Sequence, residues 1–187
     1  MGWNCPCARD KTLSVTIIKP LTPTGGLIVA GIGLGLIGGG LIGGPGLSYG
    51  FGAGAAAGFG IAALVRPAIR RHFGQPSRFQ AAALKAAIML ELLAFLVLGL
   101  YGHDWSFERL LLAVLVVVSA HFLIMTLSHG PMMFGLGATG LGWLVLAMFY
   151  LHLPLHQILV GDGALKLIFG AAMAAPMLLR LRAPEET

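Results

Sequence analysis

Two ionisable side chains, Glu91 and His121, lie deep inside apolar stretches of the sequence. An ionisable group at the centre of a bilayer costs about 2.5 to 3.5 kcal/mol on insertion scales, so each one is by default a candidate functional residue. A carboxyl group beside an imidazole can exchange a proton near neutral pH, as a proton relay or a proton-coupled carrier requires. The sequence therefore suggests a midplane transport or proton site, whose further candidate members are Lys85, Ser119 and Thr139.

Position along the expected helices places most of these side chains at a similar depth. At 1.5 Å per residue from Phe79, Glu91 lies roughly 18 Å into its helix, and Lys85 about 9 Å, from where a lysine can extend to the membrane surface. The next expected helix enters the membrane from the opposite side, and its Ser119 and His121 lie at a depth of roughly 20 Å. Two interpretations stay open, because such a pair either carries protons or is a polar contact that specifies packing.

A serine hydrolase is a second candidate chemistry. Residues 46–50 read Gly-Leu-Ser-Tyr-Gly, which matches the G-x-S-x-G pattern around Ser48, and the same side of the membrane is expected to hold His103, Asp104, His152 and His156. Six helices with a serine near a helix start resemble the intramembrane serine proteases of the rhomboid kind, although the His and Asn signatures of that family are absent. The motif also needs a strand-to-helix turn. We therefore rank a hydrolase below a transporter and expect no catalytic residue.

Soft-metal binding is a third candidate chemistry. Cys5 and Cys7 offer thiolates, and Met173-x-x-x-Met177 offers thioethers at helical spacing. Such ligands favour Cu(I), and the methionine pair resembles a short motif of copper uptake channels. Methionines are also common apolar filler in helices, and Pro154 argues against a shared helical face for His152 and His156. The sequence favours packing, and we expect neither a metal nor a cofactor.

Glycines recur every four residues in the first two apolar segments. At helical pitch each row forms a smooth stripe that lets backbones approach closely where lipid supplies no hydrophobic drive. The first two helices are therefore predicted to pack tightly, against each other or across an oligomer interface. Residues 33–38 also match a dinucleotide-binding pattern formally, but that pattern needs a preceding strand, so we discard it. The rows are Gly31, Gly35, Gly39 and Gly43, then Gly50, Gly54 and Gly58.

Composition and hydropathy define the elements that must position these residues. The chain of 187 residues is 57% hydrophobic and only 10% charged, against roughly 25% charged in soluble domains. Its basic residues flank apolar segments, which argues against nucleic-acid binding. About 20 apolar residues cross a bilayer as a helix. Six stretches qualify or nearly qualify, namely 25–43, 47–65, 79–100, 107–127, 132–151 and 163–179, with Asp162 and Lys166 at the outer start of the last.

Basic residues set the orientation, because Lys and Arg concentrate in cytoplasmic loops. With six helices, the opposite side holds only Arg109 and Lys166. The sequence therefore predicts an all-α integral membrane protein of three helical hairpins, with one transmembrane domain at 25–180 and cytoplasmic tails at 1–24 and 181–187. The residues on the cytoplasmic side are Arg9, Lys11, Lys19, Arg66, Arg70, Arg71, Arg78, Arg180 and Arg182.

The favoured function is a small transporter or channel-like protein of the inner membrane with a midplane polar site. The expected partners are the lipid bilayer and either further copies of the chain or a membrane complex, but no nucleic acid. The alternative is a non-catalytic subunit or scaffold that packs through its glycine-striped helices. The substrate and the number of subunits do not follow from the sequence.

Overall fold

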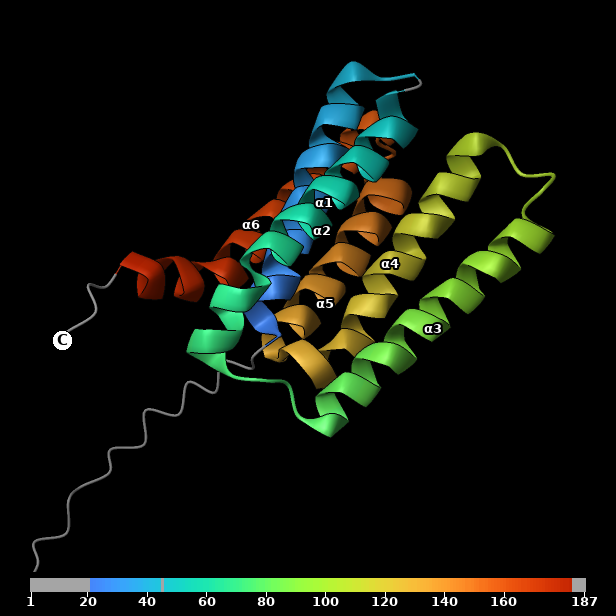
Figure 1. Ribbon diagram of the computed structural model, residues 1–187. Coiled ribbons are helices and arrows are strands. Elements are labelled where there is room, and N and C mark those ends of the chain that lie inside the picture. Colours follow the sequence, from blue (N-terminus) through green and yellow to red (C-terminus); the bar gives the residue numbers. More distant parts are fainter. Residues whose placement is uncertain (1–20, 45, 183–187) are drawn as a thin grey trace, which may run out of the picture.

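The computed structural model describes residues 21–44 and 46–182, and these ranges contain helices and no strand (Figure 1). Six of the helices are long and apolar enough to cross a membrane. The protein is therefore a multi-pass membrane protein in contact with lipid. The helices are α1 (Thr22–Ile42), α2 (Gly46–Phe73), α3 (Arg78–Tyr101), α4 (Phe107–His129), α5 (Pro131–Val145), a π-helical turn η1 (Leu146–Tyr150) and α6 (Leu155–Arg182).

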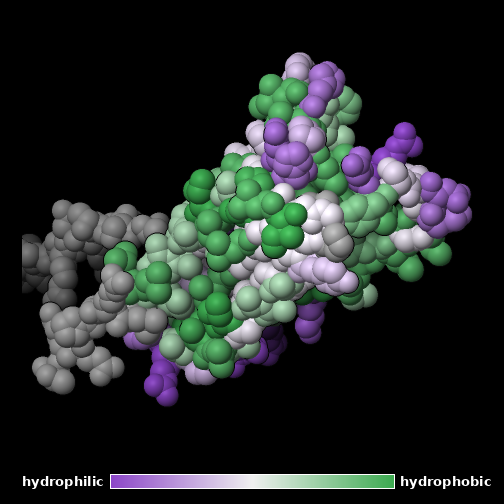
Figure 2. Space-filling model, turned by 90° about the horizontal axis from the view of Figure 1, so that it is seen from above, coloured by the Kyte–Doolittle hydropathy of each residue, from purple (hydrophilic) through white to green (hydrophobic). Residues whose placement is uncertain are grey.

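The helices form an interrupted ring, in which every consecutive pair except α2 and α3 packs together. The most extensive interfaces join α1 to α6 and to α2, and further interfaces join α3 to α4, α4 to α5 and α5 to α6. Because α3 packs extensively only on α4, the ring is interrupted between α2 and α3 (Figure 1). Large apolar side chains cover the outside of the bundle, with polar residues in separate patches (Figure 2).

The central helix α1 approaches its two neighbours through two glycine faces. A Cβ at Gly31 would lie 2.6 Å from the carbonyl oxygen of Gly54 on α2, and a Cβ at Gly33 would lie 2.6 Å from that of Gly163 on α6. Real side chains do not tolerate such distances, so only glycine permits both interfaces. The face toward α2 holds Gly31, Gly35 and Gly39 against Gly50, Gly54 and Gly58, and the face toward α6 holds Gly26, Gly33 and Gly40.

Gly43, which was expected to pack in one row with Gly31, Gly35 and Gly39, instead ends the helix α1. It follows the last residue of α1, has φ +70°, and its backbone N–H donates to the carbonyl of Gly39. A Cβ at this position would meet nothing within 4 Å. Glycine is used here because a positive φ is strained for other residues. The expectation that Gly43 packs against the second helix of the same chain is therefore wrong.

Two expected helix boundaries also differ from the structure. α2 continues past Val65 to Phe73 despite Pro67 inside it, so the arginines at 66, 70 and 71 lie on a helix rather than in a loop. α6 begins at Leu155 instead of Gly163 and carries Pro176, and its ribbon bends toward its C-terminal end (Figure 1). Asp162 and Lys166 therefore lie about 10 and 16 Å along α6 at 1.5 Å per residue.

Candidate functional site

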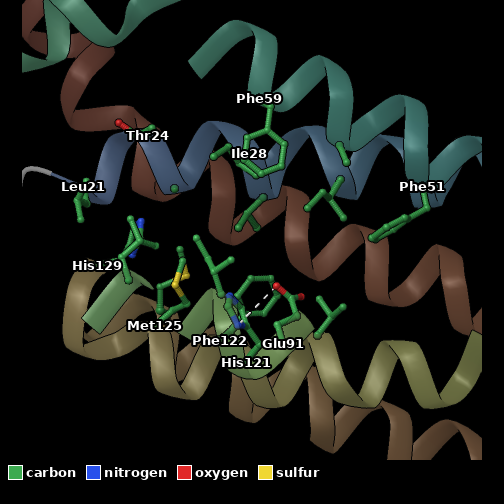
Figure 3. Close-up of a pocket in the computed structure, with 18 of the residues that line it drawn as sticks. Leu21, Thr24, Ile28, Phe51, Phe59, Glu91, His121, Phe122, Met125 and His129 are labelled. Carbon is green, nitrogen blue, oxygen red and sulfur yellow. Dashed lines mark ion pairs between the residues drawn. The ribbon is translucent and has the colours of Figure 1, made fainter. Parts of the chain in front are cut away.

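A pocket of about 350 Å³ lies at the interruption of the ring, between α1 and α2 on one side and α3 and α4 on the other (Figure 3). Its volume falls in the range of about 300 to 1,000 Å³ that is usual for small-molecule sites. The lining is almost wholly apolar, and its ionisable members are Glu91, His121 and His129. The pocket therefore suits an apolar molecule with few polar contacts.

The structure brings Glu91 and His121 together at the wall of this pocket. Nδ1 of His121 lies 3.7 Å from Oε2 of Glu91 and 3.2 Å from the carbonyl oxygen of Ala87. Because a carbonyl oxygen only accepts hydrogen bonds, Nδ1 carries a hydrogen when it bonds to Ala87. The side chains of His121 and Glu91 are 8% and 22% exposed, so the carboxyl group is the more accessible member of the pair.

Both members of the pair lie near the middle of their helices. At 1.5 Å per residue, Glu91 is roughly 20 Å from the start of α3, and His121 is roughly 21 Å from the start of α4. Ala87 and Glu91 are one turn apart on α3 and share a face, so a single imidazole reaches both. An ionisable pair at this depth is costly unless its members interact.

Lys85 and Thr139 lie away from this pair. Lys85 is exposed and does not line the pocket. Thr139 is also exposed, and its hydroxyl donates to the carbonyl oxygen of Gly135 in its own helix at 2.7 Å. The sequence suggested both residues as further members of the site, but their side chains point in other directions around the helix axis.

Ser119 belongs to a second buried polar cluster, together with Asp162 and Lys166 of α6. The ammonium of Lys166 donates to Oδ2 of Asp162, and both side chains are 1% exposed. Oγ of Ser119 and Oδ1 of Asp162 have no hydrogen-bond partner among the described residues. A Cβ at Gly140 would lie 2.9 Å from the first atom and 3.8 Å from the second, so this glycine leaves room beside both.

The aromatic ring of Phe122 separates the two polar clusters. Its centroid lies 5.8 Å from Nζ of Lys166, within the range of a cation–π contact. The same ring lies edge-on to the ring of His121, with 6.0 Å between the centroids, and it lines the pocket. Phe122 therefore shields the buried ion pair from the pocket.

Sequence reasoning missed three of these polar residues. Asp162 and Lys166 were expected at the membrane surface, although the apolar residues on both sides of them could have indicated a longer helix. His129 fell between the predicted stretches 107–127 and 132–151, yet it is the last residue of α4, and it lines the pocket with Met125 and His121. These three side chains are spaced by four residues and so share one helical face.

The structure gives the hydrolase hypothesis no support in its described part. The helix α1 precedes the G-x-S-x-G segment, where a nucleophile elbow needs a strand. The side chain of Ser48 lies outside the described residues. His103 pairs with Asp104 at 3.0 Å in an exposed loop, and His152 precedes α6 while His156 lies within it.

The methionine pair considered as a soft-metal ligand lies in the bundle core. Met173 and Met177 are buried, and Met173 packs in an apolar cluster with Val29 and Phe122. Among the described residues, no group of three or more His, Cys, Asp or Glu side chains could hold a metal ion. The Cys5 and Cys7 prediction lies outside the described residues.

Six apolar helices around an interrupted ring, with ionisable groups inside the bundle, define a polytopic membrane protein. Within this class the chain belongs to a family of unknown function, DUF6609, whose model matches residues 21–178. The match covers α1 to α5, α6 as far as residue 178, and both buried polar clusters. No curated protein and no solved structure matches the chain.

Proposed function

We propose that the protein is a small membrane transporter whose substrate site is the pocket bordered by Glu91 and His121. The observation that carries this proposal is the contact between a carboxyl group and an imidazole, 3.7 Å apart, on the wall of an otherwise apolar pocket. Ionisable groups inside membrane bundles commonly mark substrate or proton pathways. A carboxyl–imidazole pair that takes up and releases a proton would carry protons down a gradient and couple substrate movement to it.

The arrangement in the membrane is part of the proposal. The three hairpins are α1–α2, α3–α4 and α5–α6, with both ends of the chain on the cytoplasmic side of the inner membrane. Lys166 lies inside the bundle, so it no longer counts as a loop residue. Of the two basic residues assigned to the outer loops, only Arg109 is left, and the positive-inside asymmetry becomes larger.

The scaffold alternative has less support from the packing of α1. Its glycine faces contact α2 and α6 of the same chain, so a partner protein would have to use another surface. We therefore favour the transporter. Assembly into an oligomer stays a prediction, with an interface formed by outward-facing residues of other helices.

Replacing Glu91 by glutamine tests the transporter directly. Glutamine keeps the size and polarity of the side chain but cannot exchange a proton at neutral pH. In proteoliposomes with an imposed pH gradient, we expect the full-length wild-type protein to move protons at a rate at least tenfold above that of Glu91→Gln. A pH-sensitive dye inside the vesicles measures the rate.

The matched control for this experiment is Glu108→Gln. It makes the same chemical change at an exposed residue in the first turn of α4, so it should retain the wild-type rate at equal protein incorporation. Equal rates for all three proteins, or no rate above that of empty vesicles, would contradict the proposed proton coupling.

A further inference from the structure

The pocket at Glu91 continues into a second pocket toward the end of α2. This second pocket has a volume of about 270 Å³ and extends to Gly74 and Pro76 in the loop between α2 and α3. The two pockets share lining residues, so they form one groove along the interruption of the ring. The shared residues are Leu21, Thr24, Ile28, Phe59 and Leu84.

The two ends of this groove differ in charge. Arg66 and Arg70 line the second pocket, and no Asp or Glu is among its lining residues. Because they are four residues apart on α2, the two guanidinium groups share a helical face. Guanidinium groups bind carboxylates and phosphates through paired hydrogen bonds. The carboxyl group of Glu91 lies at the other end of the groove and would repel an anion there.

The middle of the groove is apolar and suits one hydrocarbon chain. At about 30 Å³ for each water-sized group, the 350 Å³ of the first pocket takes about a dozen methylene-sized groups. α2 and α3, the helices on either side of the interruption, are both long and apolar enough to cross a membrane. A molecule dissolved in the bilayer therefore reaches the groove without passing through water.

We propose that this groove binds an amphipathic anion taken from the bilayer. Its single apolar chain lies in the pocket with its end toward Glu91, and its carboxylate or phosphate headgroup binds Arg66 and Arg70. This assignment names the substrate class of the proposed transporter, although binding itself can be tested without transport. Two arginines at one end and a carboxyl group at the other set the direction in which the ligand lies.

The test compares dodecyl phosphate with dodecanol, which has the same chain and no charge. Native mass spectrometry of the full-length protein in a neutral steroidal detergent, which has no acyl chain to compete, gives the dissociation constant of each. We expect dodecyl phosphate to bind at least tenfold more tightly than dodecanol. The double variant Arg66→Gln/Arg70→Gln should remove this preference, since basic groups near a membrane surface attract anionic headgroups.

The control double variant Arg71→Gln/Arg78→Gln removes the same charge from exposed residues outside the groove lining. It should keep the preference for dodecyl phosphate. Equal affinity for the two probes, or an equal loss in both double variants, would overturn the proposal, because the attraction would then come from diffuse surface charge.

A second pair of variants tests where the hydrocarbon chain of the ligand lies. Leu84→Trp puts an indole where both pockets meet and should weaken binding of dodecyl phosphate at least tenfold, while Leu92→Trp on the exposed face of the same helix should not. Equal binding of dodecyl phosphate by the two variants would overturn the assignment of its hydrocarbon chain to the groove.

Failure of this proposal and failure of the transporter are distinguishable. Glu91→Gln should retain the preference for dodecyl phosphate, since the headgroup lies at the other end of the groove. If that preference stands but proton movement is independent of Glu91, the ligand site stands and the transporter is contradicted. If proton movement depends on Glu91 but dodecyl phosphate is not preferred over dodecanol, the transporter is supported and this ligand class is overturned.

Discussion

Lys166→Met is expected to lower the free energy of unfolding by about 3 to 5 kcal/mol, which is the usual cost of removing one partner from a buried ion pair. The carboxyl group of Asp162 would stay in the bundle core without its ammonium partner, and its Oδ1 already has no partner among the described residues. Reversible unfolding in mixed detergent micelles, followed by circular dichroism, measures the change.

The double variant Lys166→Met/Asp162→Val removes both charges, so it distinguishes the loss of the whole ion pair from the burial of one unpaired charge. Apolar replacement of a whole buried ion pair is often neutral or stabilising, so the double variant should recover most of the stability lost in the single one. Lys85→Met makes the same substitution at an exposed lysine and should stay within about 0.5 kcal/mol of wild type. A double variant no more stable than the single one would show that the pair is not the cause.

Gly33→Leu is expected to prevent α1 from packing on α6. A Cβ at Gly33 would lie 2.6 Å from both the carbonyl oxygen of Gly163 and the backbone nitrogen of Leu167. Backbone atoms inside a helix cannot rotate away as a side chain can, so the helices must separate and lose their contacts. We expect a cost above the roughly 1 to 3 kcal/mol usual for overpacking, seen as lost thermal stability and aggregation in size-exclusion chromatography.

The matched control is Gly38→Leu on the same helix. Nothing lies within 4 Å of a Cβ at Gly38, so leucine there should change the stability by no more than about 0.5 kcal/mol. Both substitutions replace a glycine in the same apolar helix, so their effects on helix propensity and insertion are similar. Equal behaviour of the two variants would contradict the glycine-dependent contact between α1 and α6.

The six helices could be predicted from the sequence because long apolar stretches signal membrane crossing without reference to any neighbour. The start of α6 was missed, since Gly161, Asp162 and Gly163 resemble a loop in isolation and obscure the apolar signal on both sides of them. In the structure Gly163 lies against Gly33 of α1, and a glycine used for close packing has the same sequence signal as one used in a turn. The contact that distinguishes these uses joins residues far apart in the chain.

The candidate site shows the same division between local and long-range information. Counting residues along a helix gave the depth of Glu91 and His121 but not the direction of each side chain around the helix axis. The neighbours of α3 and α4 determine which faces meet, and Thr139 points outward while His121 reaches Glu91. Gly26, Gly33 and Gly40 recur every seven residues, but this spacing was not recognised in the sequence because the segment is rich in glycine at other spacings.

The interface between α1 and α6 joins the first of the described helices to be synthesised with the last. Until ribosomes have delivered α6 to the membrane, one glycine face of α1 has no native neighbour, and the helix that joins α1 to α5 is missing. Contacts between segments so distant in sequence form slowly, because a long connecting chain must be ordered first. Assembly during translation therefore stays incomplete until the end of the chain is made, and a truncation before Leu155 would disrupt the packing of the first helix.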